Sequence, residues 1–324
     1  ASANDIYNTL LDGADGLVLA AETAIGKYPT KCVGMIVKLI NIFDEESISD
    51  KYFYKKEPMS LLVGPHGGEL VSRELSETEQ EKTDFSCFKS IEVSDKYLMD
   101  CEQISVGTYS PLTGFLCRDD LESVLNNYRL KNGVVWTLPV VLQLAKDIIK
   151  NIKVGERIIL KDSTGKSRSF LDVKEIYKVD LMDVAKKWFG TSSVEHPGVK
   201  NLIEGGEFFV GGDITLIERG KSGFMQYELT PSQTRLIFKN KGWSKVVGFH
   251  TRNVIHLGHE YIQKKSLKKS FADGLFISPV IGPKNSGDFR AGPILKSYQL
   301  MLDHGFYSPD KVCLGAFSTY SRYS

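Results

Sequence analysis

The spacing of hydrophobic and polar positions changes three times along the chain, and each change predicts a different kind of structure. Residues 1–43 combine a helical period from Asp5 to Leu11, a short apolar run at Leu17-Val18-Leu19, and an amphipathic segment from Thr30 to Phe43. This order predicts a helix, a strand and a second helix. Residues 44–58 are polar, mix both charges and keep no period, so we interpret them as a linker.

Short strands separated by turns dominate residues 59–228. Lys187 and Trp188 lie in a short helical stretch between them. The pattern predicts a small, β-rich, barrel-like domain. The expected strands are apolar runs bounded by Gly, Pro and Asn, at Val134 to Leu144, Arg157 to Leu160, Ser169 to Tyr177, Glu207 to Val210 and Ile214 to Glu218.

Residues 229–324 change to an alternation of strands and helices. Strands are expected at Lys245 to Phe249, Gly274 to Ile281 and Lys311 to Phe317, with helices at His256 to Lys269 and Pro293 to His304. This alternation predicts a parallel sheet with right-handed crossovers. Because the sequence stops shortly after the third strand, we expect this α/β domain to be incomplete. The predicted fold class is therefore a multi-domain α/β protein.

Composition narrows the range of partners. The 41 Lys and Arg residues balance 40 Asp and Glu residues, which argues against nucleic acid as the main partner. No apolar run approaches the roughly 18 residues that span a bilayer, so we expect no membrane segment. The five cysteines are odd in number and never form C-x-x-C, which indicates neither a disulfide framework nor a zinc knuckle. A reducing cytoplasm fits this pattern best.

The segment from Gly248 to Glu260 is the most informative part of the sequence, because it joins a predicted strand to a predicted helix. A helix amino terminus at the carboxyl end of a parallel strand offers N–H groups to an anion. His256 and His259 fall on one face of the first helical turn, where both rings can reach the same phosphate. Gly258 removes a side chain where the backbone must come close to a nucleotide.

A metal site is the competing interpretation of the two histidines. Zinc proteases place a glutamate between them, as H-E-x-x-H, whereas Glu260 follows the second histidine here. We therefore expect no metal bound by these side chains.

His-x-Gly-His after a strand resembles the signature of the nucleotidyltransferase superfamily, and the preceding Thr-Arg-Asn narrows the resemblance to ATP sulfurylase. The segments Pro65 to Gly68, Ser110 to Phe115 and His196 to Val199 resemble the amino-terminal, PUA-like domain of that family. The resemblance implies ATP as substrate with Mg²⁺, and sulfate as acceptor. It implies catalytic roles for Thr251, Arg252 and Asn253, nucleotide binding by Phe249, His256, Gly258 and His259, and sulfate binding by His250 and Arg252.

The chemistry of such a reaction agrees with these residue types. A sulfate oxygen attacks the α-phosphorus of ATP in line while pyrophosphate leaves, so the transition state is crowded with negative charge. Arg252 can clamp an oxyanion through two N–H groups and keeps its charge at any working pH. Thr251 and Asn253 can donate hydrogen bonds to pyrophosphate oxygens, and the histidines to the α or β phosphate.

A second loop follows the next predicted strand and should lie beside the first at the same sheet edge. It resembles a loop of the same family in Gly282, Lys284, Gly287 and Asp288. The alternative is an ordinary turn with a solvated lysine, since Gly, Asn and Ser form loops in any case.

Several positions depart from the family pattern. His250 replaces a glutamine that contacts sulfate, Leu257 replaces an arginine near the phosphates, and Ser278 stands where a histidine is common. The family's later G-R-D-H segment does not occur before Ser324. We therefore expect this fragment itself to be inactive, and the acceptor anion stays open.

Residues 1–43 resemble a different family, through Leu11 to Gly16, Ala21 to Ala24 and Gly26 to Pro29. These segments are similar to the last part of the pyruvate kinase barrel. That family's metal-binding and phosphate-binding groups lie upstream and are not present here. The resemblance implies a fragment of a TIM-type barrel, non-catalytic here, from a fused or adjacent pyruvate kinase-like domain.

The leading hypothesis is sulfate adenylyltransferase activity, in which ATP and sulfate give adenosine 5′-phosphosulfate and pyrophosphate. One alternative is a nucleotidyltransferase for another acceptor. A second is an inactive, ATP-binding module that regulates a fused pyruvate kinase-like enzyme. The sequence is compatible with a homo-oligomer and does not fix the oligomeric state.

Overall fold

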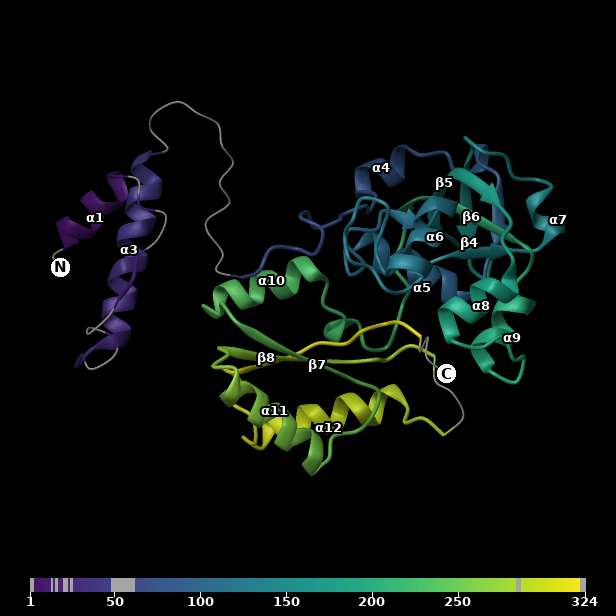
Figure 1. The fold of residues 1–324 in the computed structure, drawn as a ribbon. Helices are drawn as coiled ribbons and strands as arrows, with labels where there is room; N and C mark the ends of the chain where they lie inside the picture. Colours follow the sequence, from purple (N-terminus) through teal and green to yellow (C-terminus); the bar gives the residue numbers. More distant parts are fainter. Residues whose placement is uncertain are drawn as a thin grey trace. The chain divides into compact units, whose positions relative to one another are not determined.

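A computed structural model of the chain describes residues 3–12, 14, 17–19, 23, 26–47, 62–283 and 287–320. It divides into two compact units, Ala1–Met59 and Ser60–Ser324. In the first unit, helix α1 (Ala3–Leu11) contacts helix α3 (Pro29–Ser47), as drawn in Figure 1. Both helices were predicted, and both are confirmed.

Two expectations for the first unit are wrong. Leu17 to Leu19 form no strand, and Val18 is 93% exposed. A β-strand is stabilised by backbone hydrogen bonds to a neighbouring strand. The described part of this unit contains no second strand with which these residues could pair. Helix α3 also continues through residues 44–47 of the expected linker, since Glu is a good helix former. Residues 48–58 lie outside the described part of the chain, as do several residues of the pyruvate kinase-like segments.

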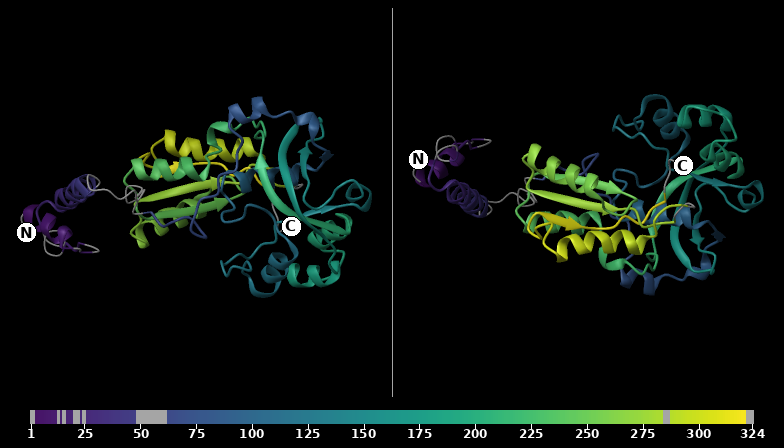
Figure 2. Two further views of the ribbon diagram at one scale, coloured as in Figure 1. Left: turned by 90° about the horizontal axis from the view of Figure 1, so that it is seen from above. Right: turned by 90° about the horizontal axis from the view of Figure 1, so that it is seen from below.

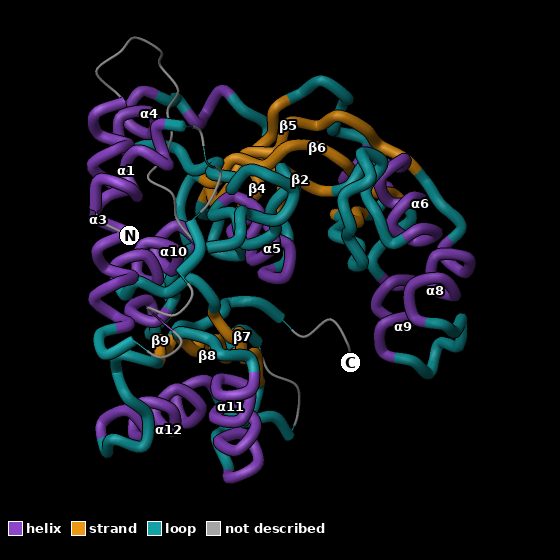
Figure 3. The backbone as a smooth tube through the Cα atoms, turned by 60° about the vertical axis from the view of Figure 1, so that its left-hand side comes forward, coloured by secondary structure: helices purple, strands orange, loops and turns teal. Residues whose placement is uncertain are grey.

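The amino-terminal part of the second unit is built on a six-stranded, curled sheet (Figure 3). Its strand order is β1-β4-β5-β6-β2, and β3 pairs with β6. The strands are β1 (Ser90–Glu92), β2 (Gly114–Phe115), β3 (Leu142–Leu144), β4 (Arg157–Lys161), β5 (Ser167–Tyr177) and β6 (Phe208–Leu216).

The helices of this part are mostly short. They are α4 (Glu77–Lys82), α5 (Asp95–Ser105), α6 (Arg118–Asn127), α7 (Lys146–Ile149), α8 (Leu181–Phe189) and α9 (Pro197–Glu204), with a 3₁₀ turn η1 at Phe85–Cys87. The expected helical stretch around Lys187 and Trp188 is confirmed as α8. Helix α5 packs on β5 and β6 and carries the fully buried Ile104 into the core.

Strand boundaries differ from the prediction most in two places. Of the expected strand from Val134 to Leu144, only β3 forms, because Pro139 cannot donate to a ladder and the Trp136 indole closes a loop onto the Leu138 carbonyl. The two strands expected on either side of Gly211-Gly212 are one continuous strand, β6. A Cβ on Gly212 would lie 2.1 Å from the Asp172 carbonyl oxygen, so this glycine allows a close approach of β5.

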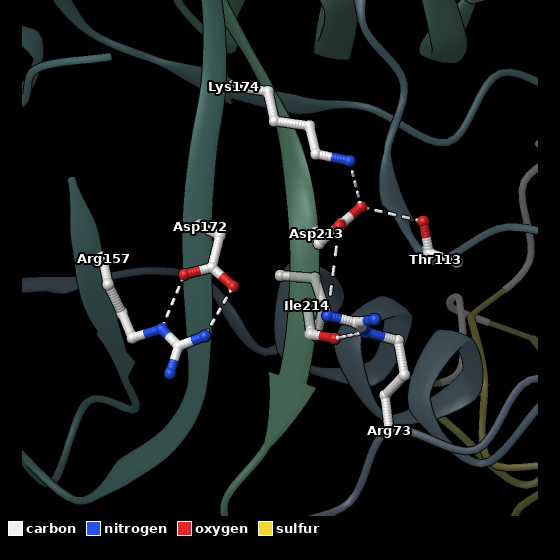
Figure 4. A network of polar contacts seen from close by, with 7 residues as sticks. All are labelled: Arg73, Thr113, Arg157, Asp172, Lys174, Asp213 and Ile214. Atoms are coloured by element: carbon white, nitrogen blue, oxygen red, sulfur yellow. Dashed lines mark hydrogen bonds and ion pairs between the residues drawn. The ribbon is translucent and has the colours of Figure 1, made fainter. Parts of the chain in front are cut away.

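Polar contacts on the sheet surface cross between strands (Figure 4). Arg157 donates two hydrogen bonds to the Asp172 carboxylate, at 2.6 and 2.8 Å. Asp213 accepts from Lys174 at 2.7 Å and from Thr113 at 2.8 Å. Since these groups are at least partly exposed, each contact adds little stability, but together they favour one register of β4, β5 and β6.

The carboxyl-terminal part contains a parallel sheet of β7 (Val246–Thr251), β8 (Gly274–Pro279) and β9 (Val312–Leu314). Helix α10 (Pro231–Asn240) covers one face, and α11 (Leu257–Lys269) and α12 (Ala291–Asp303) cover the other, as Figures 1 and 2 show. A 3₁₀ turn, η2 (Met225–Tyr227), precedes α10. The predicted alternation and parallel pairing are confirmed, with small shifts at the ends of elements.

The carboxyl ends of this parallel sheet contact the preceding part of the same unit. Gln103 of α5 donates through Nε2 to the Ser318 carbonyl at 3.1 Å. The Tyr109 and Thr319 hydroxyls are 3.2 Å apart, and the Tyr109 ring meets Phe317 edge to face. Within the described residues, no helix is long and apolar enough to cross a membrane.

Candidate functional site

The predicted motif begins on the last residues of β7. Thr251 ends the strand and is 9% exposed, and its Oγ1 accepts a hydrogen bond from the Asn253 backbone N–H at 3.2 Å. His250 donates through Nδ1 to the Ser278 carbonyl of β8 at 2.8 Å, and its ring lies 5.6 Å from that of Phe317. The motif is therefore attached to the neighbouring strand and to the segment after β9.

The two predicted histidines lie together at the start of α11. His256 caps the helix, because its Nδ1 accepts a hydrogen bond from the Gly258 N–H at 3.1 Å. The His256 and His259 rings stack with centroids 3.8 Å apart. A Cβ on Gly258 would lie 3.0 Å from the His256 ring, so the nearest group that this glycine accommodates is the capping ring.

His259 lies in surroundings that disfavour its charged form. Burial lowers its pKa, and the neighbouring His256 lowers it further, while a backbone contact with Val254 acts in the opposite direction. The Phe249 ring meets the His259 ring at 5.4 Å in an edge-to-face arrangement. At neutral pH the His259 ring is therefore uncharged, and the contact with Phe249 holds it in place.

Arg252 connects the motif to the second predicted loop. Its side chain is 51% exposed, and Nη1 lies 3.7 Å from the Asp288 Oδ1. The two loops therefore meet at one sheet edge, as expected. Gly287 has a φ of +91°, which favours glycine, whereas Lys284 lies outside the described residues.

Gly282 has a structural reason to be glycine. A Cβ at this position would lie 1.9 Å from the Thr319 carbonyl oxygen. The loop after β8 therefore runs against the backbone after β9, and no side chain fits between them.

Sequence reasoning missed the residues that lie behind the motif. Ser297 of α12 accepts a hydrogen bond from the Ile255 N–H at 3.3 Å, and Tyr298 of the same helix is fully buried. Gln263 of α11 is also fully buried. The helical period of residues 293–304 predicts that Tyr298 is buried, but it carries no information on which polar groups lie beside it.

Three cavities reach this sheet edge, and the first, of about 440 Å³, touches it through Pro283 and Tyr320. A second, of about 530 Å³, is lined by Gly282, Pro283 and Ser318 together with Glu102, Arg168 and Lys221. A smaller one, of about 170 Å³, is lined by Ser278 and Phe317, the two residues that contact His250. No residue from Phe249 to His259 lines any of these cavities. In the described part of the chain, no cluster of three or more His, Cys, Asp or Glu could hold a metal.

Comparison with known families divides the second unit into two matched ranges. Residues 63–219 match the family described as PUA-like domain, and residues 225–324 match ATP-sulfurylase. Neither range includes residues 1–62, so the resemblance of residues 1–43 to pyruvate kinase stays a prediction.

Curated relatives match most of the chain. The sulfate adenylyltransferase of Persephonella marina is 37% identical over 270 residues, covering 81% of this chain and 69% of that protein. The enzyme of the same name from Pyrococcus abyssi is 39% identical over 267 residues, covering 82% of this chain and 68% of its own length. The Nostoc punctiforme sulfate adenylyltransferase is 36% identical over 267 residues, with 81% and 67% covered.

A solved structure shares the fold. The hexameric APS kinase from Thiobacillus denitrificans superposes with a TM-score of 0.64 at 20% sequence identity. The match covers 80% of this chain, which spans about half (47%) of the length of that protein. At this identity the likeness concerns the fold alone.

Proposed function

The chain belongs to the sulfate adenylyltransferase family, and on this basis we propose that residues 249–259 form the site of adenylyl transfer from ATP to sulfate. The products are adenosine 5′-phosphosulfate and pyrophosphate. Residues 59–228 would serve mainly as a PUA-like scaffold, and residues 229–324 would supply the reacting groups on a Rossmann-like, nucleotidyltransferase sheet.

The observation that carries this proposal is the stacked pair of His256 and His259 at the amino terminus of α11. The helix begins at the carboxyl edge of a parallel sheet, where N–H groups point outward and anions bind favourably. Thr251, Arg252 and Asn253 lie a few residues earlier at the same edge. The end of β7 and the start of α11 therefore present hydrogen-bond donors to the phosphates of ATP.

In the proposed reaction, a sulfate oxygen forms a bond to the α-phosphorus as the bond to the pyrophosphate oxygen breaks. Arg252 would hold the sulfate and the developing charge, and its contact with Asp288 keeps the guanidinium near the sheet edge. Thr251 and Asn253 would hold pyrophosphate, and the two histidines the α or β phosphate. Mg²⁺ would arrive with ATP as part of the substrate and neutralise phosphate charge.

His250 bears on which anion accepts the adenylyl group. A neutral imidazole has one N–H, and here that N–H is at Nδ1, donating to the Ser278 carbonyl. If His250 contacts sulfate through Nε2, it can donate only as an imidazolium, whereas an amide donates at any pH. A different oxyanion acceptor is therefore the second candidate function, favoured by this one substitution.

Other expectations remain proposals that the family assignment leaves open. They are the cytoplasmic location, a homo-oligomeric state, and a pyruvate kinase-like neighbour to residues 1–43. The idle, ATP-binding module is the candidate from a different class, and the exposed Leu257 in place of a cation favours it.

Pyrophosphate release from Mg-ATP by the full-length protein, measured with and without sulfate, tests the proposal. We expect Arg252→Ala to lower kcat/KM by about a hundredfold or more, as removal of a transition-state donor does. Its stability should change by less than about 0.5 kcal/mol, since the side chain is half exposed. Arg129→Ala, at an exposed site that donates to the Gly133 carbonyl, is the matched control and should keep full activity.

The possible outcomes distinguish the three candidate functions. An Arg252→Ala rate within about threefold of the parent would remove this residue from the transition state. Pyrophosphate release that needs a different anion would favour the other acceptor. Binding of ATP without any turnover would favour the idle module.

A further inference from the structure

Helix α5 buries charged and amide side chains as well as apolar ones. Asp100 is 0% exposed, Glu102 is 7% exposed and Gln103 is 5% exposed. The apolar residues of the same turn, Cys101 and Ile104, belong to the core of the curled sheet. Burying a polar group costs free energy unless the group finds a partner, so the partners of these three side chains show what else the helix holds.

Two of the three side chains bind segments outside the curled sheet. The Glu102 carboxylate accepts from Arg219 Nε at 3.1 Å and from the Gly220 N–H at 3.0 Å, at the start of the connection to the carboxyl-terminal part. The Asp100 Oδ2 accepts from the Tyr320 hydroxyl at 3.1 Å, in the segment after β9. Helix α5 therefore contacts both the connection and the end of the parallel sheet.

Gln103 holds the backbone of the segment after β9. Its Nε2 donates to the Ser318 carbonyl at 3.1 Å. The preceding residue, Phe317, donates through its N–H to the Pro279 carbonyl at the end of β8, at 2.8 Å. The Phe317 ring lies 5.6 Å from the His250 ring. The path from Gln103 to His250 thus consists of one hydrogen bond, one step along the backbone and one ring contact, all of which are formed in the structure.

A cavity of about 170 Å³ lies beside Phe317, and Gln103 and Ser278 also line it. Close packing holds a side chain in place on every side, whereas a side chain next to open space can shift into it. The position of Phe317 therefore depends on the bonds around it. The Gln103 hydrogen bond and the edge-to-face contact of the Tyr109 ring limit how far Phe317 can move away from His250.

We infer that Gln103 is a positioning residue that fixes, through Phe317, the orientation of the His250 ring toward the acceptor anion. This inference rests on the proposed function, in which His250 contacts sulfate. The Nδ1 of His250 donates to the Ser278 carbonyl, so Nε2 is the ring atom left to face the anion. A hydrogen bond weakens steeply as its angle departs from linear, so a tilt of this ring lowers affinity for the acceptor and leaves ATP binding unchanged.

The first test needs no substrate and uses NMR of the whole chain. The Hε1 resonance of His250, assigned by its loss in His250→Gln, reports the ring current of Phe317. Gln103→Met keeps the length of the side chain and removes the donor, so it should displace this resonance. Gln143→Met is the matched control, because Gln143 is also buried and its Nε2 donates to two backbone carbonyls in and after α9, at 2.7 and 2.6 Å. It should leave the His250 resonance in place.

The second test follows pyrophosphate release by the full-length protein. Gln103→Met should raise the sulfate KM about tenfold, the value of one weakened hydrogen bond to a charged ligand, with the KM for ATP unchanged. In a chain that already carries His250→Ala, the same substitution should add nothing, because Gln103 acts through His250. A merely structural role would lower the stability of the chain and leave the His250 resonance and the sulfate KM as they are.

A His250 resonance that stays in place in Gln103→Met, or that moves as far in Gln143→Met, would overturn the positioning role. Losses of sulfate affinity that add in the double variant would also overturn it. If Gln103→Met does not fold, Gln103→Asn, whose amide is one methylene further from Ser318, takes its place with the same expected results. If the full-length protein uses no sulfate, the proposed function fails and the resonance alone decides: displacement confined to the Gln103 variant supports the role, and any other result overturns it.

Discussion

At the scale of single residues, the ring of His259 connects stability to pH. Burial and the adjacent His256 lower its folded-state pKa below the unfolded value of about 6.5. As pH falls below that value, the unfolded chain binds a proton that the folded chain resists, so stability is present above about pH 6.5 and is lost on acidification. The same lowered pKa keeps the His259 ring neutral for binding at pH 7.

This argument predicts that His259→Gln reduces the pH dependence of unfolding. Urea unfolding at pH 7.5 and 5.5 should show a fall in the unfolding free energy of the parent, and a smaller fall in the variant. His304→Gln removes an exposed histidine at the end of α12 and is the matched control, which should behave as the parent. Equal pH dependence in the parent and His259→Gln would show that the ring titrates alike in both states.

Residue patterns predicted part of the site and could not predict the rest. The spacing of His256 and His259 indicates a shared helical face, and the structure stacks the two rings. A local motif, however, contains no information on side chains that reach it from a helix some forty residues later. Ser297, which accepts from the Ile255 N–H, and the Phe317 ring beside His250 come from such distant segments, and only the folded chain places them.

At the scale of elements, the prediction is confirmed where a single spacing of hydrophobic residues runs through the whole segment. Helices α11 and α12 and the parallel strands were found because amphipathic helices alternate with short apolar runs. It failed at β6, where Gly211 and Gly212 look like a turn in sequence but sit in a strand that a neighbour approaches closely. Such tertiary contacts override local propensity.

Gly282 gives an element-scale prediction. A Cβ there would lie 1.9 Å from the Thr319 carbonyl oxygen, and neither backbone segment can move aside cheaply. Gly282→Ala should therefore lower the unfolding free energy by about 1–3 kcal/mol, the usual cost of overpacking. In the full-length protein it should also lower the rate of adenylyl transfer, because the loop that pairs Asp288 with Arg252 would shift.

Gly248→Ala is the control for this loop. A Cβ on Gly248 meets nothing within 4 Å, and its backbone lies in an ordinary strand, so its stability in urea unfolding should match that of the parent or slightly exceed it. If Gly282→Ala is as stable as Gly248→Ala, the loop after β8 can accommodate a methyl group despite the short distance to Thr319.

At the scale of the whole molecule, the small parallel sheet depends on the part of the second unit that precedes it. Its three strands bury few side chains of their own, chiefly Leu275, Ile277 and Val312. Support comes from Tyr109, whose ring meets Phe317 and whose hydroxyl bonds that of Thr319. Phe317 in turn contacts His250, so this contact connects the scaffold to the candidate site.

Tyr109→Ala should therefore destabilise the parallel sheet selectively, by about 3 kcal/mol, as removal of a large aromatic side chain does. Amide exchange is the measurement: exchange in β7 and β8 should become faster, while β5 and β6, with their own core, keep their protection. Tyr109→Phe, which keeps the ring against Phe317 and loses the hydrogen bond to Thr319, should cost about 1 kcal/mol. Equal loss of protection in both sheets would mean that the two parts unfold as one cooperative unit. No loss in either sheet would mean that the parallel sheet is stable without the contact between Tyr109 and Phe317.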